Sequence, residues 1–261
     1  RTILLVFLSQ FLLLHSRASS PTPPTITVPG YFSNFKEAIE KCTPETTSII
    51  VQPGEHRWDN FLEVGQRVDI RGSPEAILPG TLWMKKGSGG EFSNIEVMKE
   101  TGSCIIFEGG QWNIESCRLF CSRWAVLWCR CESETTIKNC FIGGVEEGPG
   151  YCVNCQDHAR TFVQGCTLER CGGEYSAAVA VFHNVRTRVH NCVFQANQFA
   201  LRAVTAKDVT LELIGNTING DLWYDNSRPG NLAQQGNTHN DVPLADIGVV
   251  SGPDGFPIPL R

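Results

Sequence analysis

The sequence lacks an excess of basic residues: 22 Lys and Arg stand against 27 Asp and Glu, a net charge of −5. This argues against nucleic acid as the main partner. The apolar run from Ile3 to Leu14 is too short for a membrane span, which takes about 20 residues. No two aspartates are adjacent, and no tight cluster of carboxylates indicates a calcium site. We therefore predict no metal, no cofactor and no stable membrane span.

The first residues are typical of a targeting segment. A short apolar run follows Arg1, and Ser16-Arg-Ala18 offers the small residues that a signal peptidase recognises. The pattern predicts a signal peptide over residues 1–18 and a secreted, extracellular protein. A membrane anchor or a buried N-terminal element are the alternatives. Residues 19–32 are rich in Pro, Ser and Thr and predict an extended linker.

A six-residue phrase recurs through the middle of the chain and determines the predicted architecture. Its fourth positions lie 22 to 26 residues apart, as in a stacked array of coils. The third position is almost always Asn or Gly, the residues that most readily accept a positive φ. We expect a strand to end before this residue and a new strand to begin after it. The copies are 92–97, 114–119, 137–142, 163–168, 189–194 and 213–218.

Each coil also contains two strands before its phrase, so the pattern predicts about seven coils of three short parallel strands. In the first strand of each coil alternate residues face inward. The residues expected to face outward are Trp83, Ile105, Trp128, Asn154, Ala180 and Val204. The solenoid is predicted over residues 33–225, with a capping helix near 34–42 whose N-cap is Ser33 or Asn34. Residues 226–261 are rich in Gly, Pro and Asn and predict a tail.

Several of the twelve cysteines occupy repeat columns in which other coils place Ile, Met or Val. Such cysteines are expected to act as small buried apolar residues. Cys42, Cys121, Cys131, Cys152 and Cys171 fall outside these columns and are the better disulfide candidates. Cys129-x-Cys131 with Cys152-x-x-Cys155 resembles a zinc pattern, but the predicted strand faces separate the two pairs.

The helix followed by Ile49-Ile-Val-Gln-Pro-Gly54, together with the recurring phrase, resembles the right-handed parallel β-helix proteins of the pectin-lyase-like class. The phrase is similar to the carbohydrate-binding and sugar-hydrolase repeats of that class. The resemblance implies an all-β fold and covers about residues 33–225. It leaves function open, because the class includes lyases, hydrolases, esterases and binding modules. The hydrolase motifs Asn-Thr-Asp, Asp-Asp and Gly-His-Gly are missing, and no pectin-esterase motif is matched.

A polar strip follows the first strand of each coil. Alignment by the phrase places Glu108, Cys131, Asp157 and His183 in one column and Glu132 and His158 in the next. Glu132 and Asp157 would lie on neighbouring coils, at the spacing of paired glycosidase carboxylates. His158 and His183 beside them could move protons. Glu132, Asp157, His158 and His183 are therefore the catalytic candidates. The alternative is that a loop facing water is polar for that reason alone.

The outward face of the first strands provides a second candidate site. Trp83 and Trp128 share a column two coils apart, with Lys85, Arg130 and Gln156 beside them. Indole faces flanked by hydrogen-bonding groups suit a sugar chain. We therefore predict substrate or ligand binding by Trp83, Trp128, Arg130 and Gln156. The alternatives are a strip covered by the chain itself and a protein-binding surface.

Three functions remain possible on these grounds. The first is a secreted, non-catalytic β-helix that binds a polysaccharide or protein partner along its outer strand face. The second is a polysaccharide lyase or glycoside hydrolase that uses the polar strip near Asp157. The third is a purely structural or surface protein that has no ligand.

Overall fold

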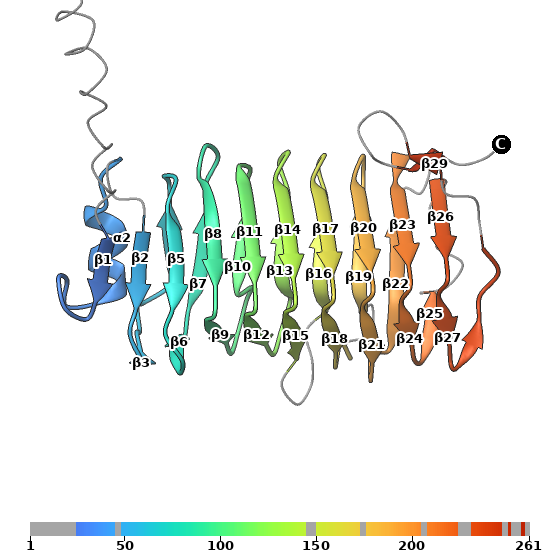
Figure 1. Ribbon diagram of the computed structural model, residues 1–261, viewed down its shortest axis with the longest axis horizontal. Helices are drawn as coiled ribbons and strands as arrows, with labels where there is room; N and C mark the ends of the chain where they lie inside the picture. The colour runs from blue at the N-terminus through green and yellow to red at the C-terminus, as the bar shows by residue number, and fades with distance from the viewer. Residues whose placement is uncertain are drawn as a thin grey trace, which may run out of the picture.

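The computed structural model describes residues 25–44, 48–144, 150–172, 176–204, 208–223, 231–246, 250–251 and 257–258. The predicted signal peptide lies outside these residues. The described chain is an all-β parallel solenoid of about eight coils with one short helix, drawn as a row of stacked coils in Figure 1. The predicted fold class is confirmed, and the predicted number of about seven coils is about one too small.

Three sheets run the length of the solenoid, and all their strands are parallel except the last strand of sheet 3, which is antiparallel to its neighbour. Sheet 1 consists of β4 (Phe61–Val64), β7 (Thr81–Met84), β10 (Ile105–Phe107), β13 (Ala125–Cys129), β16 (Tyr151–Cys155), β19 (Ala177–Phe182), β22 (Phe199–Val204) and β25 (Asp221–Trp223). Sheet 2 consists of β1 (Thr25–Val28), β2 (Ser48–Val51), β5 (Asp69–Gly72), β8 (Gly89–Ser93), β11 (Gln111–Glu115), β14 (Glu134–Lys138), β17 (Arg160–Gln164), β20 (Arg186–His190), β23 (Thr210–Ile214) and β26 (Asn231–Gln235). Sheet 3 consists of β3 (Gly54–Glu55), β6 (Ala76–Leu78), β9 (Glu96–Lys99), β12 (Arg118–Cys121), β15 (Phe141–Gly144), β18 (Thr167–Glu169), β21 (Val193–Gln195), β24 (Thr217–Ile218), β27 (Thr238–His239) and β28 (Val242–Pro243).

The recurring phrase is the corner between sheets 2 and 3. Its third residue has a φ between 52° and 62° in all six copies, Ser116 included. The next residue turns into the interior, and the strand of sheet 3 begins directly after it. The sharp corner therefore depends on one left-handed residue in each coil, as the Asn and Gly column predicted.

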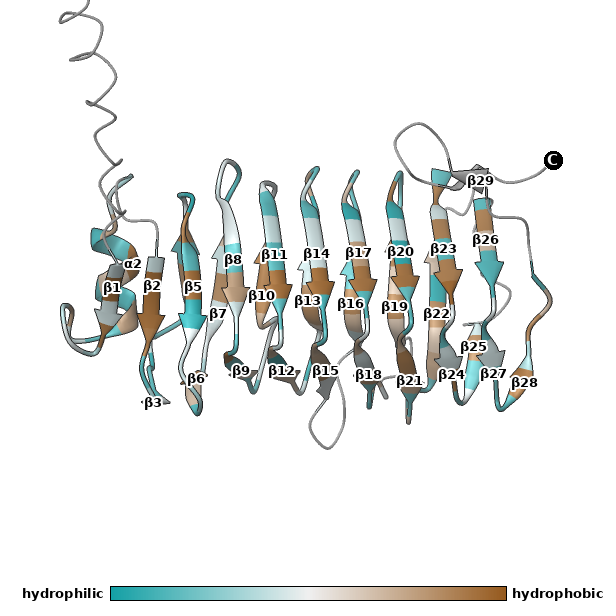
Figure 2. Ribbon diagram, viewed as in Figure 1, coloured by the Kyte–Doolittle hydropathy of each residue, from teal (hydrophilic) through white to brown (hydrophobic). Residues whose placement is uncertain are grey.

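The interior is filled by columns of like apolar residues. In sheet 1, for example, Leu82, Ile105, Leu127, Val153, Val179 and Leu201 lie in register and are all fully buried. In Figure 2, β11, β14, β17 and β20 each change from teal or white to brown toward the arrowhead, so equivalent positions on neighbouring strands match in hydropathy. Each coil therefore buries its apolar edge against the coils on either side of it.

A column of cysteines lies just inside the corner and makes more than apolar contacts. Each backbone N–H in the column donates to the side chain one coil further on: Cys117 to Sγ of Cys140 (3.4 Å), Cys140 to Sγ of Cys166 (3.4 Å) and Cys166 to Sγ of Cys192 (3.5 Å). Each thiol also lies near the carbonyl of the last residue but one in the sheet 2 strand of the previous coil, such as Ile137 O for Cys166 (3.7 Å). The thiols are buried, as predicted, and they also satisfy backbone groups.

One end of the solenoid is covered by helix α2 (Phe35–Lys41), which lies at the blue end of Figure 1. Asn34 is the N-cap, and its Oδ1 accepts from the Glu37 N–H at 2.8 Å. Phe35, Ala38 and Ile39 are buried against the first coils. The predicted helix and cap are confirmed, although the helix ends at Lys41 and leaves Cys42 half-buried. No helix in the described ranges is long and apolar enough to cross a membrane.

The coils extend beyond residues 33–225 at both ends. Strand β1 lies inside the predicted linker and pairs with β2. Strands β26 and β27 lie inside the predicted tail and continue sheets 2 and 3. The last coil was missed because Gln234 and His239 replace the apolar residues of the phrase, whereas its Gly236-Asn237 corner is retained.

The register of sheet 1 differs from the prediction in two coils. Ile106, not Ile105, is in register with Trp83 and Trp128. Arg202, not Val204, pairs with Ala180. Ile105 is fully buried and directly follows the buried Cys104, so the two do not alternate between faces. Alternation therefore gave the wrong face for Ile105.

Candidate functional site

The outer face of sheet 1 has three pairs of aromatic side chains, on coils before and after that of β10, whose Ile106 lies between Trp83 and Trp128. Phe61 packs edge-on against Trp83, with ring centroids 5.1 Å apart, and Trp124 does the same against Trp128 at 6.3 Å. Tyr151 and Phe182 continue the row at 6.0 Å. These six residues, Phe61, Trp83, Trp124, Trp128, Tyr151 and Phe182, are called the aromatic row below.

A row of charges runs beside the two central tryptophans. Glu108 accepts from Lys85 Nζ and from Arg130 Nη2, each at 2.7 Å. Lys85 Nζ also lies 3.9 Å from the Trp83 ring centroid, and Arg130 Cζ lies 4.8 Å from that of Trp128. Hydrogen bonding from Lys85, opposed by burial and supported by Arg130, holds the pKa of Glu108 below its usual range. Glu108 is therefore a carboxylate that fixes two cations over two indole rings.

The structure places the predicted binding residues as follows. Trp83 and Trp128 lie two coils apart on the outer face and are half-buried. Arg130 and Gln156 follow β13 and β16 at the same level, because the Gln156 N–H donates to Cys129 O and the Arg130 N–H to Phe107 O. The described parts of the tail do not cover this surface, since β30 (Pro257–Ile258) contacts β26 at the far end of sheet 2.

Sequence reasoning missed two features of this surface. Glu108 was assigned to the turn column, whereas the structure places it level with Lys85 and Arg130. Gly109-Gly110, which has positive φ at both residues, was the available signal, because it matches the left-handed pairs of later coils. Trp124 was not considered, yet it is 63% exposed and has a φ of 77°. A bulky residue in this conformation is a backbone outlier.

The four catalytic candidates lie in the turns that join sheet 1 to sheet 2, and all four are exposed. Glu132, Asp157, His158 and His183 all have positive φ and belong to consecutive left-handed pairs. The Glu132 N–H donates to Asp157 O at 3.0 Å, so their coils are neighbours. Within the described ranges no hydrogen bond or ion pair joins these four side chains to one another. Asp and His tolerate this conformation better than most residues, which gives their polarity a backbone explanation.

A separate hollow of about 530 Å³ lies on the outer face of sheet 2. Its lining includes Glu91, Glu134, Arg160 and Phe162. Glu134 accepts from Gln111 at 2.8 Å and from Arg160 at 3.5 Å, so these polar groups satisfy one another. The hollow is the more concave surface, whereas the aromatic row has two exposed rings, those of Phe61 and Trp124.

The described residues contain no group of three or more His, Cys, Asp or Glu side chains arranged to hold a metal ion. Cys152, one of the four cysteines of the zinc pattern considered above, forms a disulfide with Cys171. Both cysteines were among the five predicted disulfide candidates.

Comparisons with known proteins agree with this architecture. No curated protein matches the sequence. Two kinds of solved structure are similar in fold. Pectate lyase Pel9A has a TM-score of 0.55 and 10% identity over 82% of this chain and 68% of that one. The deglycosylated pectin methylesterase from Aspergillus niger has a TM-score of 0.56 and 13% identity over 85% of this chain and 87% of that one.

At these identities the solved structures show a shared fold and no more. The family comparison is more direct. The model described as "Right handed beta helix region" matches residues 81–242, which is more than half of the chain. The matched segment runs from β7 to β28 and includes both central tryptophans. The protein belongs to the right-handed β-helix family.

Proposed function

We propose that this protein binds an acidic polysaccharide along the outer face of sheet 1, at the aromatic row. The observation that carries the proposal is Trp124, which is held 63% exposed at a φ of 77° next to the half-buried Trp128. Packing does not explain why an exposed indole is kept at a strained backbone position, whereas a ligand that stacks on the ring would explain it.

The charges beside the row favour an acidic rather than a neutral sugar. Three cations lie over rings of the row: Lys85 over Trp83, Arg130 over Trp128 and Arg202 over Phe182. Two carboxylates, Glu63 and Glu108, pair with Lys85, and Glu108 also pairs with Arg130. A uronate carboxylate that pairs with Lys85 or Arg130 would draw it away from the indole ring beneath it. The uncovered ring face would then be free to stack on the sugar.

We further propose that the protein acts outside the cell. A disulfide between Cys152 and Cys171 is expected in an oxidising compartment. The predicted signal peptide over residues 1–18 agrees with this location. The fold shared with pectate lyase and pectin methylesterase makes pectate and pectin the first polymers to test.

The test is isothermal titration with pectate, pectin and a neutral cello-oligosaccharide. We expect pectate to bind most tightly, and Trp124→Ala or Trp128→Ala to weaken binding about 10-fold, or about 1.4 kcal/mol. Phe120→Ala, on the outer face of sheet 3, and Arg160→Ala, in the sheet 2 hollow, are the matched controls. A loss of binding in Arg160→Ala alone would indicate that the ligand binds in the sheet 2 hollow and not at the aromatic row. Binding of none of the polymers would contradict the proposal and leave a protein partner as the next candidate.

A second candidate function is catalysis on the same class of polymer, which the fold of the two enzymes favours. Its candidate residues are Glu132, Asp157, His158 and His183. Glu132 and Asp157 lie on neighbouring coils. Incubation with pectate and pectin would be followed by the release of unsaturated or reducing ends. Product formation that is abolished by Asp157→Ala and kept in Trp124→Ala would establish the enzyme. Binding without product would favour the binding protein.

A further inference from the structure

Cys104 and Cys121 lie two coils before the disulfide-bonded Cys152 and Cys171, at closely similar positions in their coil. The register of sheet 1 pairs Ile105 with Leu127 and Leu127 with Val153, so Cys104 and Cys152 lie at the same level. In sheet 3, Cys121 pairs with Gly144, and Gly143 pairs with Glu169. Cys121 is therefore level with Arg170, the residue that precedes Cys171.

The sulfur atoms of Cys104 and Cys152 lie against equivalent carbonyl groups. Cys104 Sγ donates to Phe120 O (2.8 Å) and lies near Val97 O (3.6 Å). Cys152 Sγ lies 3.5 Å from Glu169 O and 3.4 Å from Ile142 O. Sheet 3 pairs Phe120 with Gly143 and Gly143 with Glu169, and it likewise pairs Val97 with Leu119 and Leu119 with Ile142. The two cysteines therefore share one setting, at the corner where sheet 3 returns to sheet 1.

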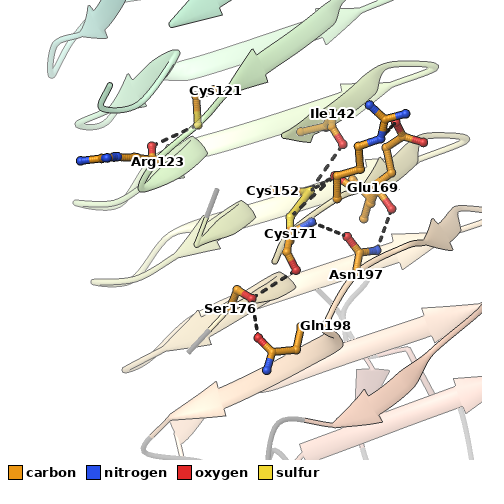
Figure 3. Close-up of a disulfide and its surroundings, with 11 residues drawn as sticks. Cys121, Arg123, Ile142, Cys152, Glu169, Cys171, Ser176, Asn197 and Gln198 are labelled. Carbon is orange, nitrogen blue, oxygen red and sulfur yellow. Dashed lines mark hydrogen bonds and ion pairs between the residues drawn. A yellow bond between two sulfur atoms is a disulfide. The ribbon is translucent and has the colours of Figure 1, made fainter. Parts of the chain in front are cut away.

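The thiol of Cys121 influences that of Cys104. Both residues are fully buried. Burial, together with a hydrogen bond to the Cys121 thiol, raises the pKa of Cys104. Figure 3 shows Cys121 on an earlier coil than the Cys152–Cys171 bond, with Cys121 Sγ directed to Arg123 O at 3.2 Å.

We propose that Cys104 and Cys121 form a second disulfide, which closes its coil in the way that Cys152–Cys171 closes a later one. The sequence separations are similar, 19 residues for the bond in the structure and 17 (121 − 104) for the proposed one. The Cα atoms of Cys152 and Cys171 are 6.4 Å apart, within the ordinary range for a disulfide. The two bonds would lie on either side of the coil of β13, which carries Trp128 and has Val126 at the same level.

The oxidant is a small-molecule disulfide such as oxidised glutathione. One cysteine thiolate attacks it and forms a mixed disulfide, which releases one glutathione thiolate. The second cysteine thiolate then attacks the protein sulfur of the mixed disulfide and releases the other. The two protein thiols lose two protons and two electrons, and oxidised glutathione becomes two molecules of reduced glutathione. Because both sulfurs are buried in the folded chain, the bond would form while the coil closes during folding.

The first experiment counts thiols. The full chain is refolded in a glutathione redox buffer, denatured without reduction, alkylated with iodoacetamide and digested for mass spectrometry. All twelve cysteines lie in described residues, so two disulfides predict eight alkylated cysteines, whereas the Cys152–Cys171 bond alone predicts ten. A cross-linked peptide containing Cys104 and Cys121 supports the proposal. Alkylation of both cysteines in a protein that retains Cys152–Cys171 overturns it.

The second experiment separates a disulfide from ordinary packing. In oxidising buffer we expect Cys104→Ala and Cys121→Ala each to lower the thermal midpoint by roughly 5–10 °C, and the double variant to lower it no further than the single ones. In reducing buffer the difference from the parent protein shrinks. Cys117→Ala is the matched control, because it removes a buried thiol outside this pair, and its shift is expected to be equal in both buffers. Equal shifts in both buffers for Cys104→Ala would contradict the proposal.

Discussion

The backbone N–H of Cys192 donates to Oδ1 of Asn216 on the next coil at 2.9 Å, and this bond continues the cysteine column into an asparagine column at the same position of the coil. Beyond it, the Asn216 N–H donates to Oδ1 of Asn237 at 2.9 Å, and Nδ2 of Asn216 donates to Val189 O at 2.7 Å. In the cysteine column Sγ takes both roles, accepting the neighbouring N–H and facing the equivalent carbonyl. A buried thiol and a buried amide therefore satisfy the same two backbone groups.

This equivalence predicts how Cys166 tolerates substitution. Cys166→Val fills a similar volume but leaves the buried Cys140 N–H without an acceptor, so we expect a loss of about 1–3 kcal/mol in the free energy of unfolding. Cys166→Asn restores an acceptor and a donor, and we expect it to stay within about 1 kcal/mol of the parent. Urea unfolding of both variants measures the difference. If Cys166→Val proved the more stable of the two, the thiol would be acting as an apolar filler.

Ser116 is the one corner residue among the six phrases that is neither Asn nor Gly, yet its φ is 55°. The left-handed conformation is easier for Asn and Gly than for other residues. We expect Ser116→Asn to raise the free energy of unfolding by about 0.5–1 kcal/mol, since the side chain is exposed and loses no packing. The reverse change at an equivalent corner, Asn139→Ser, is expected to lower it by a similar amount. No change in either variant would show that the corner sets no preference, and changes of the opposite sign would contradict the expectation.

Glu108 predicts a pH dependence of stability. The pKa of its carboxyl is lower in the folded protein than in the unfolded chain, mainly because Lys85 donates to it. Its stabilising contribution is therefore present above the unfolded value near 4.5 and is lost as the pH falls through the folded value. We expect Glu108→Gln to lower the thermal midpoint at pH 7 and to have a smaller effect at pH 3. Glu134→Gln, at an exposed pair on sheet 2, is the control and should show a weaker pH dependence.

The corner could be predicted from the sequence because one backbone requirement, a positive φ, selects a few residue types in each coil. The capping helix could be predicted for a similar reason, since Asn34 and the apolar spacing after it are local signals. Sheet 1 gave weaker signals. Cys104, Ile105 and Phe107 are all buried, because Cys104 lies in the corner beside sheet 3 and breaks the alternation.

The candidate site was predicted only in part for the same reason. Trp83 and Trp128 were found two coils apart because their strands do alternate. The row of Lys85, Glu108 and Arg130 required the register of the coil between the two tryptophans. The three consecutive buried residues 103–105, at the start of β10, concealed that register. The Cys152–Cys171 bond depends on a return from sheet 3 to sheet 1 that no local pattern marks. The contacts between sheets therefore could not be predicted from the sequence.

The final strand of sheet 3 runs in the opposite direction to the other strands of that sheet. Strand β28 is antiparallel to β27, whereas every earlier pair in the three sheets is parallel. A second copy of the chain that approached this edge of sheet 3 would meet an antiparallel strand, whereas the coils pair with parallel neighbours. At the edge of sheet 3 the hairpin therefore disfavours parallel pairing with a second copy of the chain.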